Sequence, residues 1–263
     1  MTLAAGQVSA QLAAAAPGRP VLVLCHSLLA DRSSFAPVIE GLAAHFSVIA
    51  LDLPGFGGSA AVPGGLAAIA DRVASAVVDA DARYPAAQAP TVLGNGYGGF
   101  VTLLMAIRHP GLASRLVLAD TGAAFSEPGR EAFRGMARAA SAKGLEAVAD
   151  TAMRRLFATD FHAANPALVA DRRARFLAMD PGVFLAACAE LAALDLRPDL
   201  PSVKLPALVL VGAQDEATPP PMSEELAAGL PHASLTVLSG CAHVPQLQAP
   251  DRFLAAVLPF LIA

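Results

Sequence analysis

Cysteine is scarce in this sequence, and its three copies form no disulfide or metal-binding pattern. Cys25, Cys188 and Cys241 lie far apart, and none belongs to a Cys-x-x-Cys pair. Disulfide frameworks need an even set of cysteines, and structural zinc sites need closely spaced ligand pairs. We therefore expect no disulfide and no metal site, and a reducing compartment such as the cytoplasm.

Charged residues are also sparse, since they make up 15% of the 263 residues and leave a net charge of −4. The sequence contains no basic cluster, which a nucleic-acid-binding surface would require, so we expect no nucleic-acid partner. Hydrophobic residues account for 55% of the chain. A chain of this composition can bury a large core and is not expected to be disordered.

Long apolar runs are missing as well. Proline, glycine or charge interrupts the alanine-rich segments before they reach the ~18 residues of a membrane span. The N-terminal segment MTLAAGQVSAQLAAAAPGRP has no basic residues ahead of an apolar stretch, as a secretory signal would have. These absences predict a cytoplasmic protein with no membrane contact, and they leave its oligomeric state open.

What the sequence does contain is a series of short Val- and Leu-rich runs separated by helical patterns. Apolar runs without strict alternation are typical of strands buried on both faces of a parallel sheet. Their regular alternation with helical patterns predicts an α/β fold with a mostly parallel, doubly wound sheet. The predicted strands are Val21–Cys25, Ser47–Leu51, Thr91–Gly94, Leu116–Asp120, Ala207–Gly212 and Ser234–Ser239, and the helices between them are Ser33–His45, Leu66–Tyr84 and Gly98–His109.

The alternation of strand and helix patterns stops near residue 121 and resumes near residue 201. Between these points the sequence shows helical patterns without clear strands, punctuated by Asn165-Pro166 and Asp180-Pro181, where proline suits a first helical turn. We expect a core formed by residues 1–121 and 201–263, with a helical cap insert over residues 122–200. The helices predicted there are Glu131–Lys143, Leu145–Phe157, Pro166–Met179 and Pro181–Leu194.

The segment Gly94-Asn95-Gly96-Tyr97-Gly98 follows one predicted strand and leads into a helix. Its spacing is that of the nucleophile elbow G-x-S-x-G, where a sharp, strained turn presents the nucleophile and small neighbours let helix and strand meet. Gly96 occupies the serine position. The elbow pattern is therefore present without its nucleophile.

The same glycines admit a second interpretation. Gly94, Gly96 and Gly99 also match the dinucleotide-binding pattern G-x-G-x-x-G. That pattern usually follows the first strand of a fold and precedes an acidic residue about 20 residues later, at the end of the next strand. The match here lies on a middle strand, which favours the elbow, although Asp120 keeps the nucleotide alternative open.

Two loops near the carboxyl end supply an acid and a base. Asp215 follows one predicted strand and His243 follows the next. The chain order of elbow, acid and histidine is that of the α/β-hydrolase active site. Asp120, which also ends a strand, is an alternative acid, and Cys241 beside the histidine is expected to pack as a small apolar residue.

These segments together resemble the α/β-hydrolase superfamily over almost the whole chain. Cys25-His26-Ser27-Leu28 resembles its oxyanion loop, usually His-Gly, with Ser27 departing from the pattern. The stretch Asp52–Ser59 is similar to its D-x-P-G-x-G-x-S motif. More narrowly, His-Ser-Leu and Leu118–Thr121 resemble the 3-oxoadipate enol-lactonase branch.

The resemblance implies an α/β-hydrolase fold, a His243–Asp215 pair and an oxyanion hole formed by the backbone amides of Leu28 and Tyr97. It implies structural roles for His26 and Asp52 in their loops. We expect no cofactor, because the sequence has no ligand cluster. The insert carries many Phe and Met residues and no basic cluster, which favours a small, largely apolar ester, lactone or diketone as substrate.

Glycine at position 96 rules out acyl-enzyme chemistry there, since it has no hydroxyl. Three hypotheses follow. The first is an enzyme, a hydrolase, lactonase or lyase, that uses His243–Asp215 on water or directly on its substrate. The others are a non-catalytic ligand-binding protein and a serine hydrolase inactivated by a Ser-to-Gly change. Glycine would leave space for a water or substrate hydroxyl beside the histidine. Serine-directed organophosphates should not label the protein, and an adduct on Ser27, Ser59 or Cys241 would indicate a relocated nucleophile.

Overall fold

The computed structural model describes residues 1–13, 15 and 18–263, and an eight-stranded sheet forms its centre. The strand order is β1-β2-β4-β3-β5-β6-β7-β8, with β1 and β2 antiparallel to their neighbours and the remaining pairs parallel. The strands are β1 (Thr2–Leu3), β2 (Val8–Ala13), β3 (Val21–Cys25), β4 (Ser47–Leu51), β5 (Thr91–Asn95), β6 (Arg115–Ala119), β7 (Ala207–Gly212) and β8 (Ala233–Leu238).

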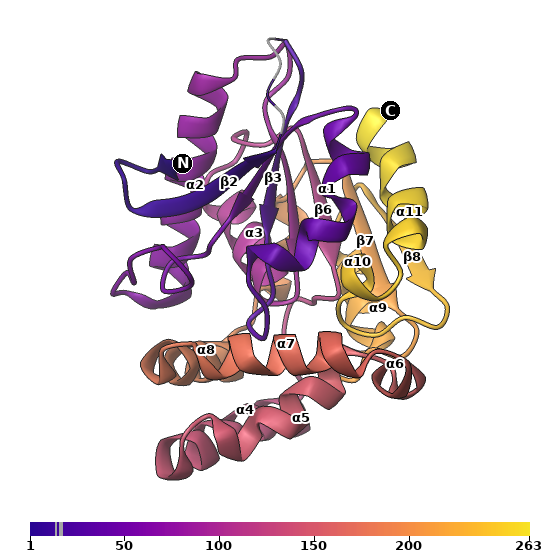
Figure 1. The fold of residues 1–263 in the computed structure, drawn as a ribbon. Helices are drawn as coiled ribbons and strands as arrows, with labels where there is room; N and C mark the ends of the chain where they lie inside the picture. The colour runs from indigo at the N-terminus through magenta and orange to yellow at the C-terminus, as the bar shows by residue number, and fades with distance from the viewer. Residues whose placement is uncertain (14, 16–17) are drawn as a thin grey trace.

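Helices cover both faces of this sheet (Figure 1). On one face α1 and α11 pack through buried apolar residues such as Leu42 and Phe253. On the other face α2, α3 and α9 bury Val73, Phe100 and Leu226. The elements are η1 (Arg32–Phe35), α1 (Ala36–Ala43), α2 (Gly65–Arg83), α3 (Tyr97–Arg108), η2 (Arg197–Ser202), α9 (Pro220–Gly229), α10 (Pro245–Gln248) and α11 (Pro250–Ile262).

The predicted α/β fold is confirmed, and each predicted strand is present with its ends shifted by at most one residue. The amino-terminal strands β1 and β2 were not predicted. Strand β2 mixes small apolar and polar residues, and it forms a strand because it pairs antiparallel with β4 at the edge of the sheet. Pairing of this kind is a tertiary effect that a local pattern does not report.

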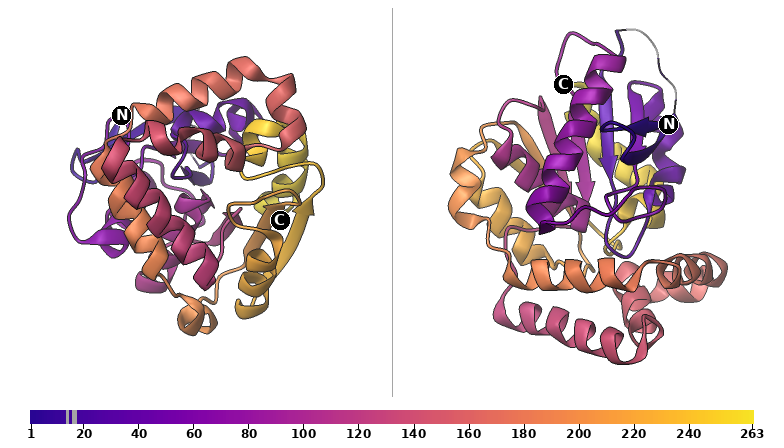
Figure 2. Two further views of the ribbon diagram at one scale, coloured as in Figure 1. Left: turned by 90° about the horizontal axis from the view of Figure 1, so that it is seen from below. Right: turned by 90° about the vertical axis from the view of Figure 1, so that its left-hand side faces the viewer.

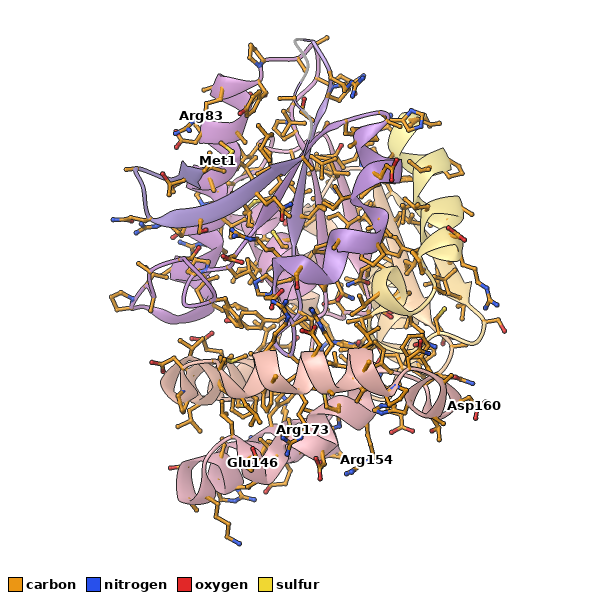
Figure 3. All side chains as sticks on the ribbon, viewed as in Figure 1. Met1, Arg83, Glu146, Arg154, Asp160 and Arg173 are labelled. Atoms are coloured by element: carbon orange, nitrogen blue, oxygen red, sulfur yellow. The ribbon has the colours of Figure 1, made fainter. Side chains whose placement is uncertain are left out.

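Five α-helices occupy the chain between β6 and β7, and they lie together at one end of the sheet (Figures 1 and 2). The Arg173 guanidinium on α7 contacts Glu146 on α5 at 2.6 Å, which ties two of these helices together (Figure 3). The division into core and cap remains a prediction. The helices are α4 (Glu127–Lys143), α5 (Glu146–Leu156), α6 (Thr159–Ala164), α7 (Pro166–Leu177) and α8 (Pro181–Ala193).

These apolar helices were compared with the length and hydropathy that a membrane-spanning helix needs. Within the described ranges, no single helix is long and apolar enough to cross a bilayer. Helices α7 and α8 meet the length and composition criteria only when taken together, and they are bent by 93° at the break between them.

Candidate active site

Gly96 lies at the sharp turn between β5 and α3, and its backbone has φ 55° and ψ −119°. A positive φ of this kind is costly for a residue with a side chain, by about 1–3 kcal/mol, so glycine suits the turn. Gly98 is needed for close packing, because a Cβ there would overlap the backbone carbonyl of Cys25. The turn therefore has the geometry of a nucleophile elbow, with no side chain at its centre.

His243 faces this turn and is held from behind by Asp215. Its Nδ1 lies 2.8 Å from Asp215 Oδ2, and both side chains are almost fully buried. The carboxylate also accepts the Thr218 hydroxyl at 2.7 Å and the backbone amides of Ala217 and Thr218. Because the carboxylate can only accept, Nδ1 carries the proton, and Nε2 presents a lone pair on the side of Gly96.

Asp120, the alternative acid, lies near this pair without contacting the imidazole ring. Its Oδ1 accepts the Gly212 amide at 2.8 Å, and its Oδ2 accepts Asn95 Nδ2 at 3.2 Å. Burial, and then the neighbouring Asp215 carboxylate, raise the pKa of Asp120 well above its ordinary value. The geometry therefore assigns Asp215, and not Asp120, as the partner of the histidine ring.

A buried amide network fixes the histidine loop against the end of β5. Asn95 Nδ2 donates to the His243 carbonyl at 2.9 Å, and Gln246 Nε2 donates to Asn95 Oδ1 at 3.0 Å. Sequence reasoning missed Asn95, Gln246 and Thr218. For Thr218, the one signal in the sequence was its position three residues after Asp215. The side-chain amides of Asn95 and Gln246 gave no such signal, because their contacts join residues more than 140 positions apart.

Ser27 fills the space beside Gly96 that the sequence predicts to be vacant. A Cβ atom added at position 96 would overlap Ser27 Oγ and would lie 2.7 Å from His243 Nε2. The Ser27 hydroxyl itself lies 3.1 Å from that nitrogen. The space expected beside the histidine is therefore shared: the Ser27 hydroxyl lies next to Nε2, and the pocket of about 40 Å³ in front of it has room for little more than one water.

The two amides proposed for the oxyanion hole border the same point. Leu28 follows Ser27, Tyr97 follows Gly96, and both line the pocket in front of His243. In the part of the chain that the structure describes, neither backbone N–H donates a hydrogen bond to another protein group. Two free donors beside a general base are what stabilisation of a developing oxyanion requires.

The loop that carries Ser27 is held rigidly by His26. The Leu53 amide donates to His26 Nε2 at 3.1 Å, so the ring carries its proton on Nδ1 and donates it to the Ser27 carbonyl at 2.8 Å. Burial lowers the pKa of His26, which keeps this ring neutral. The Gly98 amide donates to the His26 carbonyl at 3.0 Å. This agrees with the structural role inferred for His26.

The other residues singled out in the sequence are structural in this geometry. Asp52 accepts the Gly58 amide at 3.0 Å and pairs with Arg32 at 3.1 Å, so it braces its own loop. Cys241 is fully buried, and burial raises the pKa of its thiol, so it packs as an apolar side chain. Within the described residues, no three His, Cys, Asp or Glu side chains are grouped so that they could hold a metal ion.

The pocket in front of His243 is small and mostly apolar. Its volume is about 40 Å³, and it shares Phe125, Phe133 and Arg155 with a wider outer groove of about 590 Å³. Among the described residues that line the inner pocket, Arg155 is the one charged side chain apart from the catalytic candidates. The apolar side chains that line it from the helices between β6 and β7, and from the loops beside them, are Phe125, Phe133, Met136, Phe184 and Leu191.

Comparison with known proteins places this geometry in a family. The sequence model of the family described as alpha/beta hydrolase fold matches residues 20–250. 3-Oxoadipate enol-lactonase 2 of Acinetobacter baylyi is 29% identical over 242 residues, which cover 91% of this chain and 87% of the relative. Pimeloyl-acyl-carrier-protein methyl ester esterase of Chromobacterium violaceum is 31% identical over 248 residues, which cover 92% and 94%.

A solved structure agrees with these matches. The enol-lactonase from Burkholderia xenovorans superposes with a TM-score of 0.84 at 28% identity, covering 97% of this chain and 96% of that one. The match over residues 20–250 favours the hydrolase interpretation over the dinucleotide alternative, and the elbow role of the glycines at positions 94, 96 and 98 stays a prediction. The chain belongs to the α/β-hydrolase fold family.

Proposed function

We propose that this chain is a hydrolase of a small, largely apolar ester, lactone or diketone, and that His243 oriented by Asp215 is its general base. The observation that carries the proposal is the 2.8 Å bond between Asp215 and His243 Nδ1, which leaves Nε2 facing the pocket at the elbow. A base held in one tautomer beside two free amides is an arrangement suited to acyl transfer.

The substrate class rests on the pocket and on the relatives together. The relatives are named as a lactonase and a methyl ester esterase, and both names refer to a carboxylic ester bond, cyclic or open. The inner pocket is lined by Phe and Leu side chains from helices that we propose to act as a cap. A volume of about 40 Å³ holds little more than one water, so we infer that these helices or their side chains move to admit a substrate.

Arg155 adds a specific expectation about the substrate. Among the described residues its guanidinium has no carboxylate partner, and its polar contact is with Met136 Sδ at 3.9 Å. An unpaired cation at the wall of an apolar pocket suits a substrate with one anionic group. We expect Arg155→Met to lower kcat/KM for a carboxylate-bearing ester such as p-nitrophenyl hemiglutarate by about 10- to 100-fold. This is the loss expected when one hydrogen bond between charged groups is removed.

The neutral ester p-nitrophenyl butyrate should show little change in the same variant, because it offers no anion to this side chain. Arg154→Met is the matched control, since Arg154 is the adjacent arginine on α5 and is exposed (Figure 3). An equal loss with both esters would mean that Arg155 supports the helices and does not select the substrate.

The proposed function is tested by exchanging the two buried acids in turn. We expect Asp215→Asn to lower kcat/KM for short p-nitrophenyl esters by about 10³-fold, because an amide that donates to Nδ1 would favour the wrong tautomer. Asp120→Asn should cost far less, since Asp120 does not contact the ring. Thermal unfolding of both variants shows whether each still folds.

The remaining hypotheses correspond to other outcomes of this experiment. A wild-type protein that hydrolyses none of these esters, lactones or diketones, yet binds them with micromolar affinity, would be a ligand-binding protein. An inactive wild type that gains activity when a serine is installed at position 96 would be an inactivated serine hydrolase. A larger loss in Asp120→Asn than in Asp215→Asn would transfer the acid role to Asp120.

A further inference from the structure

The Ser27 hydroxyl is placed as the nucleophile of a catalytic triad would be. Its Oγ lies 3.1 Å from His243 Nε2, and the opposite ring nitrogen is bound to Asp215 at 2.8 Å. Because Nδ1 carries the proton, the hydroxyl donates to Nε2. No other hydrogen bond of Ser27 Oγ is present among the described residues, so the histidine is the one group that can accept its proton.

The hydroxyl also lies beside the point at which a side chain at position 96 would start. A Cβ at position 96 would overlap Ser27 Oγ and would lie 2.9 Å from Ser27 Cβ. The Ser27 side chain therefore takes up space that a side chain at position 96 would need. A residue other than glycine at position 96 would displace the Ser27 side chain from the histidine.

We propose that Ser27 is the nucleophile of this enzyme, and that Ser27, His243 and Asp215 form a triad whose serine comes from the loop after β3. This inference rests on the proposed hydrolase function and adds a residue to it. The loop is suited to the role because His26 fixes the Ser27 carbonyl through a 2.8 Å bond. The residues with free amides, Leu28 and Tyr97, line the same pocket as Ser27, and Leu28 is next to Ser27 in the chain.

The reaction balances with water as the one added reactant. Ser27 Oγ bonds to the substrate carbonyl carbon while its proton passes to His243 Nε2, and the carbonyl oxygen becomes an oxyanion facing the Leu28 and Tyr97 amides. The bond to the leaving alkoxide then breaks, and the alkoxide takes the proton from Nε2. Water repeats the sequence on the acyl-serine ester, releasing the carboxylic acid and restoring the Ser27 hydroxyl.

The test is covalent labelling of the full chain with diethyl p-nitrophenyl phosphate, followed by peptide mapping in a mass spectrometer. The sequence alone predicts no labelling, whereas with Ser27 as nucleophile we expect one adduct per chain, on Ser27, with release of one equivalent of p-nitrophenol. Ser27→Ala should remove the adduct, and His243→Ala should slow labelling by at least about 10²-fold, because general-base catalysis contributes about 10²–10⁴-fold. Gly96→Ala should also suppress labelling, because its Cβ would overlap Ser27 Oγ.

Ser34→Ala is the matched control. Ser34 is a buried serine whose hydroxyl has no partner among the described residues, so its loss should change neither folding nor labelling. An adduct on another residue, or no adduct, would overturn the assignment of Ser27. Esterase activity that depends on His243 and persists in Ser27→Ala would do the same, in favour of direct attack by water.

Labelling does not require turnover, so the two proposals can fail separately. A Ser27 adduct in a protein that hydrolyses none of the offered esters would support the nucleophile and contradict the proposed hydrolase function. Hydrolysis without any Ser27 adduct would support the function and contradict the nucleophile.

Discussion

Replacing His243 with alanine is expected to lower kcat/KM for short p-nitrophenyl esters by about 10⁴-fold or more. Among the described residues, the ring is the single group that touches both the Asp215 carboxylate and the Ser27 hydroxyl. Whether the attacking oxygen belongs to serine or to water, its proton leaves through Nε2. Removal of the histidine in serine hydrolases has effects of this size, because the members of such a triad act as one unit.

The measurement is steady-state hydrolysis by wild type and variant, with and without added imidazole. Alanine leaves a hole beside the pocket, so free imidazole should restore part of the rate, an effect that a loss of structure would not show. His45→Ala is a suitable control, since His45 is exposed and lines neither the pocket in front of His243 nor the outer groove. A His243→Ala protein that retains its rate would mean that the base has been wrongly identified.

Moving the serine from position 27 to position 96 is expected to give an active enzyme, whereas adding a second serine is not. In Gly96→Ser alone, the new Cβ would overlap Ser27 Oγ and lie 2.7 Å from His243 Nε2, at a backbone φ of 55°. Backbone strain of about 1–3 kcal/mol adds to this overlap. We therefore expect the single variant to unfold several degrees lower than wild type, since about 1 kcal/mol lowers Tm by roughly 2–4 °C in a chain of this size.

The double variant Gly96→Ser with Ser27→Gly removes both Ser27 atoms from the contact and leaves only the histidine to adjust. It should hydrolyse p-nitrophenyl acetate at least about ten times faster than Gly96→Ser alone, and its organophosphate adduct should form at position 96. Ser27→Gly alone is the control, and it should be inactive. If the single Gly96→Ser variant matched the double in rate and Tm, the two side chains would not compete for this space.

The pattern of apolar runs determined the fold class without any information from the tertiary structure. Buried parallel strands such as β6 (Arg115–Ala119) need apolar residues on both faces, and this demand is local enough to be visible in the sequence. The edge strand β2 was not visible, because a mixed strand is stabilised by pairing with β4 and not by its own composition. The short helix α6 was missed because its six residues are too few to show a helical period.

The candidate site was determined in part by the sequence and in part by the tertiary structure. The elbow, Asp215 and His243 appear in the sequence because each is tied to a strand end by short-range spacing, and the absence of a hydroxyl at position 96 is a fact of the sequence. Only the tertiary structure shows that His243 binds Asp215 and not Asp120, since both acids end strands in the same sheet.

The tertiary structure also decided what lies in the place of the missing side chain. Ser27 and Gly96 belong to loops after the neighbouring parallel strands β3 and β5, whose register brings Cys25 opposite Gly94. Separated by nearly seventy residues in the chain, they meet because parallel strands end at one edge of the sheet. The sequence therefore determined that the elbow has no nucleophile, and the packing of two loops determined which hydroxyl faces the histidine.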